Sequence, residues 1–187
     1  MELNRLLDKA RGIRDSLERK IFFTGILVEA LKSEGEKPII VGGTAVEFYT
    51  LGGYSTLDLD LVYKEREKLS MLLEKLGFRK HGRHWYSEEL DLAVEVPGFV
   101  LSGSIEKLTK IEIGGLTAYV IGIEDIIADR LRAYVHWKSD DDGRWAKRMM
   151  ILHKDKIDWS YLEEKSRSDG TQEALEQLRV EVEKSGS

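Results

Sequence analysis

Two aspartates separated by one residue are the feature of this sequence best suited to chemistry. Asp58 and Asp60 lie in the segment 57–63, where apolar residues at every second position predict a β-strand. Successive side chains of a strand point to opposite faces, so both carboxylates share one face, about 7 Å apart. A divalent cation would offset their mutual repulsion, and Mg²⁺ prefers such oxygen ligands. The alternative is a solvated polar face.

Gly42, Gly43 and Thr44 form a second feature, between a predicted strand at 38–41 and a predicted helix at 44–51. Two glycines allow a ligand to approach the backbone closely. The helix start offers unpaired N–H groups and the positive end of its dipole, and the Thr44 hydroxyl adds a donor. The segment therefore suits a phosphate, although a glycine turn with a threonine cap is also common punctuation between elements.

A third carboxylate comes from the alternating segment 90–96, where Asp91 and Glu95 share a face. A third acid beside the aspartate pair would allow one group to hold a metal ion while another accepts a proton from an attacking hydroxyl. We expect Asp91 to converge with the pair near the start of the helix. Glu95 and Glu89 remain alternatives because the alternation places them on the same face.

Together these segments resemble the core motif of the DNA polymerase β-like nucleotidyltransferase superfamily. The resemblance rests on VGGTAV at 41–46 and STLDLD at 55–60, and more loosely on an apolar-Asp-apolar pattern within 89–96. The segment 123–133 is similar to the helix that follows the core in this group. Within the superfamily, the segments most resemble small prokaryotic nucleotidyltransferase-like proteins, including relatives of the nucleotidyltransferase toxins of abortive-infection systems.

The resemblance implies a metal-dependent site and a role for each residue. It implies that Asp58 and Asp60 hold Mg²⁺ or Mn²⁺, and that Asp91 completes the metal-binding carboxylates and activates the acceptor. It also implies a set of nucleotide-binding residues: Gly42, Gly43, Thr44 and Arg130. The reaction would move a nucleoside monophosphate from an NTP to an acceptor and release pyrophosphate.

The acceptor and the turnover are left open at this point. Tyr54 stands where relatives often carry an arginine, which favours a second hypothesis: a non-catalytic module that binds a nucleotide or a partner, or a toxin–antitoxin component. The balance of 29 basic against 34 acidic residues, a net charge of -5, favours a protein or small-molecule acceptor over a long nucleic acid. The basic and aromatic segment 79–86 keeps an RNA end open as an acceptor.

The elements that must position these residues predict an α/β (α+β) fold in one domain of 187 residues. We expect a small mixed sheet over 37–121, between an N-terminal helical segment, 1–36, and C-terminal helices, 122–187. Helical spacing predicts a helix over 2–34 that is interrupted at 24–25. Further helices are expected at 65–76, 123–137, 141–153, 158–166 and 170–184, and hairpins at 78–86 and 110–120.

Composition excludes several classes of protein and site. The absence of cysteine excludes disulfides and thiolate metal sites, and the four histidines, at 81, 84, 136 and 153, lack a compact zinc spacing. No apolar run is long enough to cross a bilayer, and the charged N-terminal segment does not resemble a signal peptide. We therefore expect a cytoplasmic protein without a membrane partner. A single asparagine and two glutamines, with abundant lysine and glutamate, are typical of a thermophile.

Overall fold

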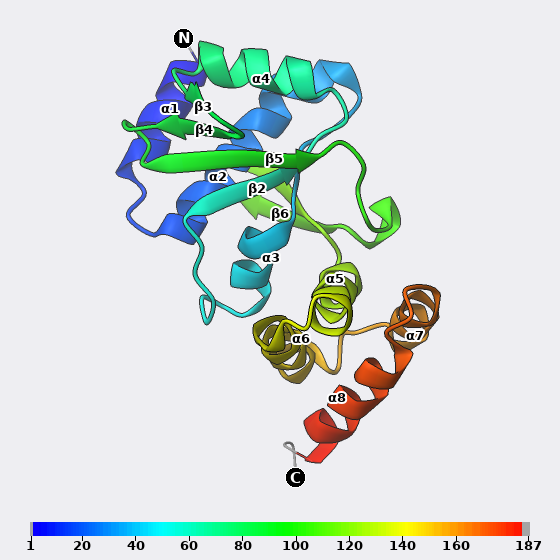
Figure 1. Ribbon diagram of the computed structural model, residues 1–187. Coiled ribbons are helices and arrows are strands. Elements are labelled where there is room, and N and C mark those ends of the chain that lie inside the picture. The colour runs from blue at the N-terminus through cyan, green and yellow to red at the C-terminus, as the bar shows by residue number, and fades with distance from the viewer. Residues whose placement is uncertain (1, 185–187) are drawn as a thin grey trace.

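The computed structural model describes residues 2–184, which form one mixed sheet with helices on its faces and at one end (Figure 1). The sheet has seven strands in the order β3-β4-β5-β2-β1-β7-β6. Its strands are β1 (Ile39–Ile40), β2 (Asp58–Val62), β3 (Arg79–His81), β4 (His84–Ser87), β5 (Leu92–Gly98), β6 (Thr109–Ile113) and β7 (Leu116–Val120). This arrangement confirms the expected fold class.

The two parallel pairings join segments that are distant in the sequence. Strand β2 runs parallel to β5, and β1 runs parallel to β7, whereas the other neighbouring pairs are antiparallel. The hairpins β3–β4 and β6–β7 lie at the two ends of the sheet. The site described below lies on β2 and its neighbours, in the middle of the sheet.

The N-terminal segment forms two helices, α1 (Glu2–Gly12) and α2 (Ser16–Leu31). The break lies at Asp15, whose side chain accepts a 2.7 Å hydrogen bond from the backbone N–H of Glu18 and caps α2. The predicted interruption at 24–25 is wrong, because both residues are buried inside α2. Gly25 allows the helix to approach β7: a Cβ there would lie 2.9 Å from the Cβ of Leu116.

The remaining helices cover the sheet and extend beyond it. They are α3 (Gly42–Tyr49), α4 (Arg66–Lys75), α5 (Ile123–His136), α6 (Asp140–His153), α7 (Trp159–Ser168) and α8 (Gln172–Lys184). Figure 1 shows α5 to α8 gathered at one end of the molecule, with α3 between them and the sheet. Helix α3 contacts both α5 and α6, so the C-terminal helices hold the helix that follows the two glycines. Within residues 2–184, no helix is both long and apolar enough to cross a membrane.

One face of β2 and β5 forms part of the hydrophobic core, and this burial fixes the direction of the other face. Leu59, Leu61 and Val94 are fully buried, in one cluster with Phe22 and Phe23 of α2. Because side chains alternate along a strand, the residues between them point away from this core and are only half-buried. Burial of the apolar side chains thus fixes the orientation of β2 and β5, and with it the direction in which their polar side chains point.

The ends of these two strands differ from expectation. Leu57 was expected on the apolar face, but it precedes β2 and is 89% exposed. Strand β5 continues beyond the expected segment 90–96, through Pro97 to Gly98. It begins at Leu92 rather than at 90, because Asp91 has a φ of 47° and belongs to the preceding turn. This last difference changes the composition of the site.

Candidate active site

Asp60 is hydrogen-bonded to the start of helix α3. Its Oδ2 atom accepts a 2.8 Å hydrogen bond from the backbone N–H of Gly43. Gly42 has a φ of 54°, and a Cβ at this position would lie 2.6 Å from the same Oδ2 atom. Position 42 therefore requires glycine both for its conformation and for the close approach of Asp60. The two features that the sequence suggested are in direct contact.

The surroundings of Asp60 disfavour its ionised form. Burial is the largest cause that raises the pKa of this carboxyl, and the charges of Glu95 and Asp58 raise it further. The N–H groups of Gly43 and Thr44 act in the opposite direction, but the pKa remains raised. A cation at this position would reverse the balance by pairing with the carboxylate.

Strand pairing brings a glutamate and a histidine to the aspartate pair. In the parallel register of β2 and β5, Glu95 lies beside Asp60. In the antiparallel register of β4 and β5, His84 lies opposite Glu95. One ligand atom from each of Asp58, His84 and Glu95 lies within 4.8 Å of the other two. These three residues, with Asp60, are called the acid–histidine cluster below.

Asp91 is not a member of this cluster, contrary to expectation. Its carboxylate lies 3.2 Å from the guanidinium of Arg19 and is 79% exposed. Glu89, the other alternative, pairs with Arg11 on the outside of α1. The turn before β5 directs Asp91 to α2, and Glu95 occupies the place on the sheet face that Asp91 was expected to take.

Thr44 is positioned by its hydroxyl rather than offering it to a ligand. Its side chain is fully buried, and Oγ1 donates a 2.8 Å hydrogen bond to the backbone carbonyl of Asp58. The hydroxyl therefore links α3 to β2 through this hydrogen bond. Gly42 and Gly43, in contrast, line a cavity of about 450 Å³ together with Asp60 and Arg130.

Arg130 reaches the same cavity but is already paired. Its Nη1 atom lies 2.7 Å from Oδ1 of Asp142, and its Nη2 atom contacts Asp129. These two carboxylates keep the pKa of the guanidinium raised in spite of burial. The positive charge that Arg130 brings to the cavity is therefore already paired with two carboxylates of the protein, those of Asp129 and Asp142. Tyr54, for its part, packs edge-to-face on Trp145 of α6, with ring centroids 5.1 Å apart.

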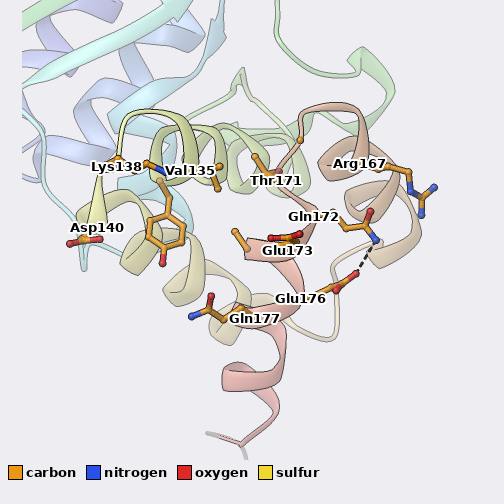
Figure 2. A pocket seen from close by; sticks show the side chains of 12 residues that line it. Val135, Lys138, Asp140, Arg167, Thr171, Gln172, Glu173, Glu176 and Gln177 are labelled. Atoms are coloured by element: carbon orange, nitrogen blue, oxygen red, sulfur yellow. Dashed lines mark hydrogen bonds between the residues drawn. The ribbon is translucent and has the colours of Figure 1, made fainter.

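A larger cavity, of about 900 Å³, lies among the C-terminal helices (Figure 2). It is lined by residues from the end of α5, the loop into α6, α7 and α8, including Lys138 of that loop, Arg167 and Glu173. Gln172 and Glu176 are hydrogen-bonded to each other at its rim, as Figure 2 shows. None of the residues of the acid–histidine cluster lines it. Its size alone does not make it the reactive site.

Comparison with known proteins supports the fold. No protein-family model and no curated protein matches the sequence. The crystal structure of an antigenic nucleotidyltransferase-like protein from Paracoccidioides brasiliensis is similar, with a TM-score of 0.54 and 18% identity over 74% of this chain and 77% of that one. The chain thus has the nucleotidyltransferase-like fold that the sequence motifs implied.

Two structures of the antibiotic-resistance factor ANT(2'')-Ia are also similar, at lower scores. The solution structure has a TM-score of 0.48 and 18% identity over 91% of this chain and 95% of that one. The crystal structure in complex with adenylyl-2''-tobramycin has a TM-score of 0.45 and 17% identity over 86% of this chain and 95% of that one. At these scores the two likenesses carry no argument about this chain.

Proposed function

We propose that this chain is a metal-dependent nucleotidyltransferase that moves a nucleoside monophosphate from an NTP to an acceptor and releases pyrophosphate. The observation that carries the proposal is the contact between the acid–histidine cluster and the glycine-rich start of α3. Asp60 lies at hydrogen-bond distance from Gly43, and the same cavity is lined by Gly42 and Arg130. Carboxylates thus lie beside a helix start of the kind that suits a phosphate, which supports the proposal.

The donor set fits a divalent cation. Asp58, Asp60 and Glu95 offer carboxylate oxygens on one face of the sheet, which are the ligands that Mg²⁺ and Mn²⁺ take in proteins. A phosphate bound at the glycines would meet the negative charge of Asp60, so the two need a cation between them. When bound, that cation would neutralise phosphate charge and orient the NTP.

Each residue of the site would have a distinct role in the proposed transfer. Gly42 would receive a phosphate at the start of α3, where the N–H of Gly43 is donated to Asp60, and Arg130 would add positive charge in the same cavity. An acceptor oxygen would attack the α-phosphorus and form a new P–O bond. The bond between the α-phosphorus and the oxygen that bridges it to the β-phosphorus would break, and pyrophosphate would leave with that electron pair. Glu95 would accept the proton of the acceptor, the role first given to Asp91. Asp58 and Asp60 would position the cation.

The acceptor is proposed to be a small molecule or a protein. The chain has a net charge of -5, which repels a long polyanion. The exposed cations of strand β3, Arg79 and Lys80, lie at the opposite edge of the hairpin that carries His84, so a short RNA end is the second candidate.

Label transfer from NTPs tests this proposal. The protein is incubated with each of the four α-³²P-labelled NTPs, Mg²⁺ or Mn²⁺ and pools of candidate acceptors, and pyrophosphate release is measured in parallel. We expect Asp58→Asn to abolish transfer and Glu95→Gln to slow it by about 10²–10⁴-fold, the usual contribution of a general base. Asp91→Asn is the matched control and should keep its activity. The assignment fails if Asp91→Asn is inactive and Glu95→Gln is not.

A non-catalytic nucleotide-binding module is the second candidate, and one observation favours it. Arg130, the cation of the cavity, is held by Asp129 and Asp142, which reduces the charge it offers to a triphosphate. Such a module would bind the NTP tightly but release no pyrophosphate with any acceptor. The same assay, combined with equilibrium dialysis of the labelled NTP, separates the two candidates.

A further inference from the structure

His84 is placed on the site by the sheet itself and not by a flexible segment. It is the first residue of β4 and lies opposite Glu95 in the antiparallel register. Its Nδ1 atom is 3.8 Å from Oδ1 of Asp58, and its Nε2 atom is 4.0 Å from Oε2 of Glu95. The next residue, Trp85, is buried on the other face of the sheet. This anchor directs the imidazole to the carboxylates.

An imidazole changes the preference of a carboxylate site for cations. Mg²⁺ is a hard cation that takes oxygen ligands in near-ideal octahedral geometry. Divalent cations of the first transition row also accept an imidazole nitrogen, and among them Mn²⁺ shares with Mg²⁺ the preference for carboxylate oxygens. A set of two carboxylates and one histidine within 4.8 Å therefore suits a transition cation better than Mg²⁺.

The side chain of Arg83 shows that this cluster attracts positive charge. It is 73% exposed and free to extend into solvent, yet its Nε atom lies 3.3 Å from Oε1 of Glu95. The same Nε–H donates a 3.1 Å hydrogen bond to Nε2 of His84. The guanidinium thus contacts two of the groups that would ligate a metal ion, and it competes with that ion for them.

We propose that His84 is a nitrogen ligand of the divalent cation, that the site consequently prefers Mn²⁺ to Mg²⁺, and that the cation displaces Arg83 from Glu95 and His84. The presence of a cation rests on the proposed function, whereas the choice of cation rests on the position of His84. The histidine thereby acquires a role that the zinc spacing of the sequence did not indicate.

Metal binding without nucleotide tests this inference. Free Mn²⁺ is followed by its electron paramagnetic resonance signal, and Mg²⁺ affinity is obtained by competition. We expect native protein to bind Mn²⁺ at least about tenfold more tightly than Mg²⁺, and His84→Asn to lose about 10–100-fold in Mn²⁺ affinity while Mg²⁺ affinity stays nearly constant. His81→Asn is the matched control, because His81 faces His84 across the hairpin but is exposed and outside the cluster.

Two further measurements keep the inference falsifiable. Electron spin-echo modulation from a coordinated imidazole nitrogen should be present in the Mn²⁺ complex of the native protein and absent from that of His84→Asn. Arg83→Gln leaves every ligand in place and should raise the Mn²⁺ affinity by roughly two- to fivefold, since an exposed charge acts weakly. Equal loss of both metals in His84→Asn, or no nitrogen modulation in the native complex, would overturn the proposal.

The outcomes separate this inference from the proposed function. If Mn²⁺ binds with nitrogen ligation but no NTP yields pyrophosphate, the enzyme proposal fails and the role of His84 stands. If label transfer occurs and the native protein and His84→Asn bind both metals alike, the function stands and the role of His84 is refuted.

Discussion

A buried ion pair behind the candidate site permits a quantitative test of how that site is held. Lys20 of α2 and Glu47 of α3 have 0% and 8% of their side-chain surfaces exposed, and Nζ of Lys20 lies 2.8 Å from Oε2 of Glu47. The same ammonium donates a 2.6 Å hydrogen bond to the backbone carbonyl of Thr56, two residues before Asp58. The pair therefore joins α2, α3 and the segment leading into β2.

Removal of one partner should be much worse than removal of both. Glu47→Leu leaves the ammonium buried with a single neutral acceptor, so we expect the free energy of unfolding to fall by about 3–5 kcal/mol. A domain of this kind has about 5–15 kcal/mol in total, so the loss is a large fraction of its stability. Lys20→Met with Glu47→Leu removes both charges and keeps the volume. Because only the Thr56 carbonyl then loses its partner, the double variant should lie within about 2 kcal/mol of native.

Urea unfolding of the native protein, both single variants and the double variant measures the coupling directly. The exposed pair Lys64 and Glu36, 3.4 Å apart, is the control, and its coupling should stay below about 1 kcal/mol. The reasoning is refuted if Glu47→Leu costs less than about 1 kcal/mol, or if the double variant is less stable than either single variant.

Three further predictions concern the site itself. Because the pKa of Asp60 is raised, the folded state binds the proton of this carboxyl more tightly than the unfolded state does. The protonated carboxyl therefore contributes stability that is fully present below the unfolded pKa of 3.8 and is lost as pH rises through the folded pKa. Urea unfolding between pH 4 and 7 should show this decline in native protein but not in Asp60→Asn. Gly42→Ala should lower the free energy of unfolding by more than about 2 kcal/mol, because position 42 has a positive φ and the added Cβ would clash with Asp60. Gly77→Ala is the control in the same unfolding assay: position 77 also has a positive φ but has no atom near the added Cβ, so this variant should cost about 1 kcal/mol. In thermal melts, Mg²⁺ and NTP at 100 times their dissociation constants should stabilise native protein and Asp91→Asn by about 2.7 kcal/mol relative to EDTA. The Asp58→Asn variant should gain far less. An equal gain in all three proteins would show that Asp58 does not hold the cation.

Local patterns in the sequence predict the elements and the shared face of the aspartates, because both depend on neighbours in the chain. Alternation across β2 is enough to place Asp58 and Asp60 together, and the core on the other face enforces it. The helix break at Asp15 also has a local signal: an aspartate followed three residues later by Glu18, the pattern of a capped helix start.

The third carboxylate and the histidine could not be chosen in this way, because they depend on register between distant strands. Asp91 and Glu95 share a face in any ideal strand, and only the parallel pairing with β2 places Glu95 beside Asp60. His84 enters through a second register, that of β4 on β5. The turn that removes Asp91 from the strand depends on a positive φ at a non-glycine residue, which sequence patterns rarely indicate. The expected third carboxylate, Asp91, and the one that the structure places beside Asp60, Glu95, are therefore four residues apart in the chain.

The energetic balance of the sheet gives a reason to look for a cation at these residues. Aspartate is a poor strand former, and carboxylates crowded on one face repel each other. The opposite face, with Leu59, Leu61 and Val94 fully buried, supplies the hydrophobic stabilisation that tolerates this repulsion. Within the described residues, the arginine in contact with the cluster is Arg83, whose charge is largely screened by water. Under the proposed function a bound divalent cation would relieve the remaining repulsion, and under the further inference the position of His84 would favour Mn²⁺ as that cation.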